Sequence, residues 1–323
     1  MMLRKGAQAH PIEFTSDLRE LLDKYCRERW SGAVQVEFAS GDWQVILVAG
    51  EMLKCAYRSV SDRIQKVNAG EERILPTQTI KHVVSYSMPA SSLRLMKIQL
   101  EQPAPDETLT VQTERLSILA TQWTKEATPN LGVLRWPEAD GFFIVASGRI
   151  FTDETAFFSQ SGQAFGSEAV VKQQAWNEPT LNISRFIYTE EIQAWVEFSV
   201  HAAFVTLLEQ VLLHYKDLTG LALLNALGRN INRVAMEHKC VISVTLGKLS
   251  DQTIFPNLDE AIRAYNAILA VSFEHIAIVL GPKLMRQAIH DSIGALEPRL
   301  AKIVTKFTAV EDFIMSEPGR IQE

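Results

Sequence analysis

Residues 30–57 read WSGAVQVEFASGDWQVILVAGEMLKCAY, and this stretch decides the fold of the first third of the chain. Apolar and polar side chains alternate over Ala33–Phe38, which is the period of a half-buried strand. Ser40-Gly41-Asp42 predicts a hairpin turn, and the mostly apolar run Trp43–Ala49 predicts a central strand. A turn at Gly50 and a third strand over Met52–Tyr57 follow, so the stretch predicts an antiparallel meander.

A helix precedes this meander, and a less regular segment follows it. The apolar side chains of the helix have helical spacing, at Leu18, Leu21, Leu22 and Tyr25, and Thr15 and Ser16 are candidate N-caps. A helix packed on a meander buries one face of each element. The polar residues 58–75 predict a solvated helix, whereas residues 79–86 fit a helix or a strand equally well.

Three runs of this region resemble a known family. They are Leu18–Leu22, Trp30–Glu37 and Val48–Ala56, and together they resemble the PATAN domain found at the N-terminus of PatA-type bacterial response regulators. The resemblance covers about residues 12–100, and the chain departs from the family pattern over residues 58–76. It implies a helix-plus-meander domain in bacterial signal transduction that acts by protein–protein contact. It implies no catalytic residues.

The middle of the chain begins after the best linker in the sequence, Gln102–Glu107, which contains two prolines. The periodicity predicts a helix over 112–127 and strands over 132–136 and 142–146. A short helix capped by Thr152 or Asp153 is expected to run to Phe158, and two further strands are expected over 169–176 and 181–188. This order of elements is similar to that of Roadblock-type dimerisation domains, which implies self-association.

The last part is predicted to be helical. Apolar stripes at helical spacing predict helices over 189–218 and 221–239, from Asn257 to Leu280, from Pro282 onward, and from Pro298 to Phe313. Residues 240–246 predict one short strand. The expected fold class is therefore α+β: an N-terminal helix-plus-meander αβ domain (1–105), a central αβ domain (106–189) and a C-terminal antiparallel helical bundle (190–323).

The composition of the chain restricts the classes of function that it can have. The 323 residues are 47% hydrophobic and 22% charged, which excludes wholesale disorder. The net charge of −6 without a Lys/Arg block argues against a nucleic-acid partner. The odd number of three cysteines favours a reducing cytosol. The start of the chain lacks a signal peptide, and charged residues within 261–280 argue against a membrane span. We therefore expect a cytoplasmic protein without a membrane partner.

The sequence carries no catalytic signature. It has no G-x-G-x-x-G, no P-loop and no G-x-S-x-G motif. The pair His238 and Cys240 supplies two metal ligands at most, so a structural role is favoured. We therefore expect no catalytic residue, no cofactor and no metal ligand.

Two sets of residues are candidate interaction sites. Helical spacing places Asn225, Arg229 and Asn232 on one face of a helix beside Arg233, which suits an anionic ligand or a carboxylate-bearing partner; the alternative is a solvated face. The second set is a candidate interface of Trp43, Trp136, Phe142 and Ile144. The two tryptophans are interpreted either as exposed contact residues or as anchors of their own small cores, and Phe142 and Ile144 belong to a strand that is expected to take part in self-association. The strands 132–136 and 142–146 are too few to finish a sheet, so they are expected either to pair across a two-fold axis or to be completed by later strands.

These observations favour a non-enzymatic bacterial signalling or scaffold protein that acts through protein–protein contacts. The partner would be a response regulator, a kinase or a small GTPase, and a homodimer is expected. Two alternatives stay open: a small-ligand sensor whose C-terminal helical bundle is the binding domain, and an enzyme whose site is assembled from scattered residues.

Overall fold

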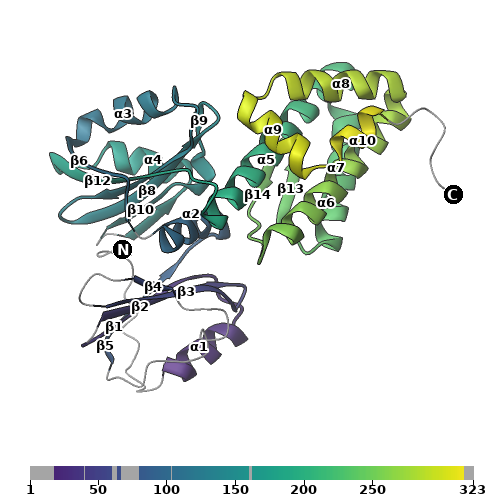
Figure 1. Ribbon diagram of the computed structural model, residues 1–323. Coiled ribbons are helices and arrows are strands. Elements are labelled where there is room, and N and C mark those ends of the chain that lie inside the picture. The colour runs from purple at the N-terminus through teal and green to yellow at the C-terminus, as the bar shows by residue number, and fades with distance from the viewer. Residues whose placement is uncertain are drawn as a thin grey trace. The chain divides into compact units, whose positions relative to one another are not determined.

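The computed structural model describes residues 18–39, 41–59, 64–66, 80–102, 104–159 and 162–315. It divides into two compact units, Met1–Ala194 and Trp195–Glu323 (Figure 1). The first unit carries two antiparallel sheets, and the second is helical with a small hairpin. The predicted α+β class with a helical C-terminal region is confirmed. The predicted domain limits at residues 105 and 189 stay a prediction.

The first sheet has the strand order β4-β3-β2-β1-β5, and all its neighbours are antiparallel. Its elements are α1 (Leu18–Arg27), β1 (Gly32–Phe38), β2 (Gly41–Val48), β3 (Glu51–Ser59), β4 (Ile64–Lys66), β5 (Ile80–Ser87) and α2 (Ala90–Glu101). The predicted helix and meander are confirmed. Side chains of α1 such as Tyr25 pack with Val36 and Trp43 in one apolar cluster.

The structure corrects the helix that the sequence predicts over residues 58–75. Instead of a solvated helix, the described part of this segment contains strand β4, which pairs with β3. Its charged side chains are compatible with an edge strand, which is why polarity alone pointed to the wrong element. The undecided segment 79–86 forms strand β5 from Ile80 onward. The candidate caps Thr15 and Ser16, the turn residue Ser40 and the linker residue Pro103 lie outside the described residues.

The second sheet has the order β11-β10-β8-β7-β12-β6, with β9 also paired to β8. Its elements are β6 (Glu107–Gln112), η1 (Thr113–Arg115), α3 (Leu116–Trp123), β7 (Asn130–Arg135), β8 (Ala139–Ala146), β9 (Arg149–Ile150), η2 (Thr152–Glu154), β10 (Ala156–Ser159), β11 (Gly162–Phe165), α4 (Ser167–Gln174) and β12 (Thr180–Ile187). The strands predicted over 132–136, 142–146 and 181–188 are present.

Two predictions in this region are wrong. Residues 169–176, predicted as a strand, belong mainly to helix α4, whose Ala169 and Gln173 share the buried face. The helix expected from Thr152 to Phe158 stops after one 3₁₀ turn, and β10 begins at Ala156. The buried aromatic side chains of β10 pack in the sheet, and tertiary packing outweighs the local cap signal.

The second unit is built on α5 (Gln193–Thr219), α6 (Leu221–Glu237), α7 (Leu258–Leu280), α8 (Pro282–Gly294), α9 (Pro298–Phe307) and α10 (Val310–Met315). The predicted cap at Asn257 is confirmed, because its side chain accepts the Glu260 amide at 2.9 Å. The single strand expected over 240–246 is instead a hairpin of β13 (Ile242–Thr245) and β14 (Lys248–Asp251). The last predicted helix is broken between α9 and α10.

The helices α5 and α7 run in the same direction. His201 and Phe204 of α5 contact Tyr265 of α7, and further along both helices Tyr215 contacts His275. The C-terminal ends of α5 and α7 therefore lie at the same end of the helical unit. Helix α6 packs beside α7, and Asn230 on it contacts His275.

Candidate functional site

Two residues of the predicted anion site on α6, Asn232 and Arg233, make contacts within their own chain. The Asn232 side chain accepts the Val244 amide at 2.7 Å and donates to the Val244 carbonyl at 3.2 Å. Arg233 pairs with Glu237 one turn later at 2.6 Å, and both side chains are more than half exposed. Arg229 is exposed and Asn225 is half-buried. The structure thus assigns Asn232 to the packing of the β13–β14 hairpin, and anion binding here stays a prediction.

The predicted interface residues are buried in the first unit. The exposed fractions of Trp43, Trp136, Phe142 and Ile144 are 2%, 5%, 3% and 0%. The indole of Trp136 donates to the Thr113 hydroxyl at 3.0 Å, and Phe142 and Ile144 lie on β8, which has β7 and β10 as neighbours. The expected exposure of Trp43 and Trp136 is therefore wrong, and the alternative, that each anchors a local core, holds. Phe142 and Ile144 are buried within the sheet.

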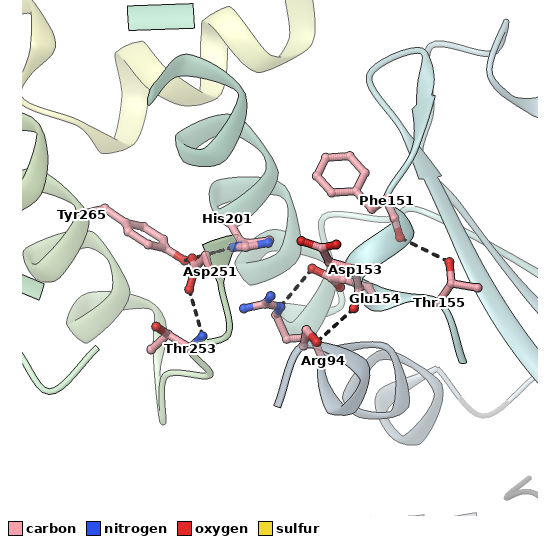
Figure 2. A network of polar contacts seen from close by, with 10 residues as sticks. Arg94, Phe151, Asp153, Glu154, Thr155, His201, Asp251, Thr253 and Tyr265 are labelled. Carbon is pink, nitrogen blue, oxygen red and sulfur yellow. Dashed lines mark hydrogen bonds and ion pairs between the residues drawn. The ribbon is translucent and has the colours of Figure 1, made fainter. Parts of the chain in front are cut away.

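The sequence did not predict a buried polar cluster in the helical unit (Figure 2). His201 Nδ1 of α5 lies 3.0 Å from Asp251 Oδ2 at the end of β14, and the Tyr265 hydroxyl of α7 donates to the same oxygen at 2.9 Å. The second carboxylate oxygen accepts the Thr253 amide at 2.8 Å. Sequence separations of 50 and 14 residues give no local signal for this cluster.

A His–Asp pair is the acid–base half of many hydrolytic sites, which also need an activated nucleophile. Cys240 lies near Asp251, but burial and then the Asp251 charge raise the pKa of this thiol to about 11. The thiol is therefore protonated at neutral pH and is a poor nucleophile. The arrangement of His201, Tyr265 and Thr253 around Asp251 is typical of a structural network, in which hydrogen-bond donors surround a buried carboxylate.

A second polar chain links three helices. His275 Nε2 lies 3.1 Å from the Tyr215 hydroxyl, and His275 Nδ1 lies 3.0 Å from the Asn230 amide nitrogen. Because the amide nitrogen can only donate, Nδ1 is the acceptor and the proton sits on Nε2. Burial lowers the pKa of His275, which favours this neutral form.

The first unit holds a buried ion pair between α2 and η2 (Figure 2). Arg94 Nε lies 3.1 Å from Glu154 Oε1, with the two side chains 10% and 1% exposed. Beside it, the Ser91 hydroxyl donates to the Asp153 carbonyl at 3.0 Å. These contacts hold α2 against η2, so we interpret the Arg94–Glu154 ion pair as structural.

The clearest surface feature is apolar. Among the described residues, ten of the twelve exposed large hydrophobic side chains lie in the helical unit. Leu218 and Leu221 flank the turn between α5 and α6, and Ile278 and Leu284 flank the turn between α7 and α8. Because α5 and α7 are parallel, these two turns lie at the same end of the unit.

The tip of the β13–β14 hairpin belongs to the same end. A Cβ placed on Gly247 would lie 2.6 Å from the Leu224 side chain, so the hairpin turn packs against the start of α6. Leu246 in that turn is 71% exposed, and Ile278 is 85% exposed. We call this surface the apolar end, and it consists of Leu218, Leu221, Leu223, Leu246, Ile278, Val279 and Leu284.

By length and composition, α5 and α7 could each cross a membrane. The sequence argument against a span over 261–280 is therefore too strict. However, the core helices of soluble proteins pass the same test, and both helices carry buried side chains such as Leu207 and Ile268. This is weak evidence for a membrane.

Comparisons of the chain with protein-family models, with curated proteins and with solved structures gave no significant match. The PATAN and Roadblock resemblances stay predictions.

Proposed function

We propose that this chain is a signalling or scaffold protein that works through protein–protein contacts, with the apolar end of its helical unit as the contact surface. The observation that carries the proposal is the gathering of exposed leucine, isoleucine and valine side chains at three turns of that unit. Exposed apolar surface is a mark of interaction sites on soluble proteins.

The surroundings of the apolar end support a protein partner. Lys216 and Asp217 precede Leu218 on α5, and Lys283 precedes Leu284 on α8; all three charged residues are exposed. An apolar centre with charged residues of both signs at its margin is the usual composition of a protein interface.

The buried polar clusters favour binding over chemistry. The Asp251 carboxylate is held by Tyr265 and by the Thr253 amide, and Asn232 is held by the hairpin backbone. Groups arranged this way stabilise the helical unit.

The PATAN resemblance supports the signalling part of the proposal. It implies a bacterial pathway in which the partner is a response regulator, a kinase or a small GTPase. A second copy of this chain is a further partner of the same kind, because homodimers are the commonest oligomers of soluble proteins.

Photo-crosslinking in cells tests the proposal. A photoreactive amino acid is placed at Leu246 or at Ile278 in the full chain, and at Val171 as the control, because Val171 is 63% exposed on α4 of the other unit. We expect one discrete protein adduct from both positions of the apolar end and none from Val171. Adducts with lipid alone, or no discrete adduct from either position, contradict the proposal.

A further inference from the structure

Each of the three turns at the apolar end carries one lysine. These are Lys216 in the last turn of α5, Lys248 after the tip of the β13–β14 hairpin and Lys283 at the start of α8, and all three are exposed. Each lysine stands within two residues of an exposed leucine of the apolar end. Apolar side chains and positive charges therefore occur together at all three turns.

The local charge of this end is opposite in sign to the charge of the whole chain. The segments 216–223, 245–248 and 278–284 contain the three lysines and one acid, Asp217, so three positive charges less one negative charge give +2. The whole chain carries −6. The charged residues that come next on α7 and α8, Glu274 and Arg286, are of opposite sign and leave this balance unchanged.

The positive sign argues against a second copy that docks by the same end. A two-fold contact places the same patch on both subunits, so the lysines of one apolar end would face the lysines of the other. Like charges that face one another at an interface disfavour the complex. A partner of negative charge has the opposite effect, since complementary charges steer the two surfaces together and speed their association.

The number of lysines favours a protein partner over a lipid surface. Recognition of anionic lipids by basic residues usually takes clusters of about four to eight Lys or Arg side chains. The apolar end has three lysines, and Asp217 stands beside Leu218, where a negatively charged membrane would repel it. Carboxylates spaced among apolar side chains on a protein match both the leucines and the lysines of this end.

We propose that the apolar end binds an acidic amphipathic segment of another protein, in which leucine, isoleucine, valine or phenylalanine side chains are interspersed with Asp and Glu. This inference rests on the proposed function, in which the apolar end is the contact surface. The apolar side chains of the segment cover Leu246 and Ile278, whose exposed fractions of 71% and 85% are the largest at this end. The carboxylates of the segment pair with Lys216, Lys248 and Lys283.

The two kinds of contact have separate roles. Burial of the apolar side chains supplies most of the affinity, because well-packed and desolvated contacts dominate the binding energy of an interface. Pairs of lysine and carboxylate at a margin exposed to water add selectivity and association rate more than affinity. The association should therefore slow as salt is added, and it should slow when the lysines are reversed in sign.

Two synthetic peptides, each added to the full chain, test the inference. Both are amphipathic helices of about 20 residues with the same leucines, and their polar positions are all glutamate in one peptide and all lysine in the other. Fluorescence anisotropy measures the affinity of each labelled peptide. We expect the glutamate peptide to bind about tenfold more tightly than the lysine peptide, and we expect Ile278→Asp to abolish its binding.

The double variant Lys248→Glu/Lys283→Glu tests the role of the charge, and Lys302→Glu/Lys306→Glu is its control. Both lysines of the control are exposed on α9, which contacts Ser199 near the start of α5, away from the apolar end. The first variant should slow the association of the glutamate peptide about tenfold and reverse the preference between the two peptides. The control changes the net charge equally and should behave as the wild type does.

The outcomes separate this inference from the proposed function. Equal affinities for the two peptides, or no binding of the glutamate peptide, overturn the inference, whereas the photo-crosslinked adduct decides the proposed function. Mixed vesicles of phosphatidylglycerol and phosphatidylcholine are tested in parallel. If the vesicles bind the wild type but not Ile278→Asp, and the glutamate peptide does not bind, the occupant is a membrane and the inference is wrong. A dimer that Ile278→Asp dissociates, measured by light scattering, overturns it in favour of a second copy.

Discussion

Asn232 of α6 holds Val244 of β13 by both ends of its amide group, with one hydrogen bond accepted at 2.7 Å and one donated at 3.2 Å. The side chain thus makes the two backbone hydrogen bonds to Val244 that a neighbouring strand would otherwise make. This contact fixes the hairpin on α6, and the hairpin carries Leu246 to the apolar end.

Asn232→Ala should destabilise the helical unit. The change leaves the amide and the carbonyl of Val244 without their partner, and an unsatisfied buried group costs about 1–3 kcal/mol. Urea unfolding measures the loss. Asn225→Ala is the matched control, because Asn225 is half-buried on the same helix; an equal loss in both variants contradicts the role given to Asn232.

Arg94→Met should destabilise the first unit strongly. It leaves the Glu154 carboxylate buried without its ion-pair partner, and breaking a buried pair costs about 3–5 kcal/mol. Arg233→Met is the control, because its exposed pair with Glu237 is worth about 0–1 kcal/mol. Thermal or urea unfolding measures the loss of stability in each of the two variants. Similar losses of stability would show that the ion pair of Arg94 with Glu154 is weak.

His275 should make stability depend on pH. Burial lowers its pKa in the folded chain below the unfolded value of about 6.5, so the unfolded state binds the proton first. Its contribution is therefore complete above that pH and is lost as the pH falls below it. Between pH 8 and pH 5, the urea midpoint of the wild type should fall further than that of His275→Gln.

His238→Gln serves as the control for this measurement, since His238 is exposed at the end of α6. It should follow the wild type over the same pH range. If His275→Gln has the same pH dependence as the wild type, the lowered pKa of His275 is refuted.

Gly50→Ala should cost more stability than Gly148→Ala. Both glycines hold the same position of a type I′ turn, so both variants carry the strain of a positive φ, about 1–2 kcal/mol. In addition, a Cβ on Gly50 would lie 2.6 Å from the Cys26 carbonyl oxygen, whereas a Cβ on Gly148 has its nearest neighbour at 3.8 Å. The urea concentration at the midpoint of unfolding is measured for both variants and should be lower for Gly50→Ala. An equal or reversed order of the two midpoints contradicts the argument.

The sequence predicted those elements whose signal is local. The alternation over Ala33–Phe38, the cap at Asn257 and the stop at Gly281-Pro282 each report a short-range preference, and the structure has all three. Residues 169–176 were mispredicted because Val170 and Val171 favour a strand locally, whereas the burial of Ala169 and Gln173 is set by the sheet beneath them.

The candidate site was harder to predict because it depends on long-range placement. The apolar end combines residues near 220, 246 and 280, and nothing in the sequence says that these turns lie at the same end of the helical unit. The tryptophans were misjudged for the same reason: Trp136 stands beside a proline in the sequence, but in space its indole lies against Phe157 in the core.

The strength of binding at the apolar end tests the central claim most directly. The protein captured from Leu246 and Ile278 is titrated by calorimetry against the wild type, Ile278→Asp and the control Val171→Asp. The account predicts that Ile278→Asp weakens the affinity by about tenfold or more, since a desolvated interface centre tolerates no buried unpaired charge. It predicts that Val171→Asp binds as the wild type does. Equal affinities for Ile278→Asp and the wild type would contradict the account.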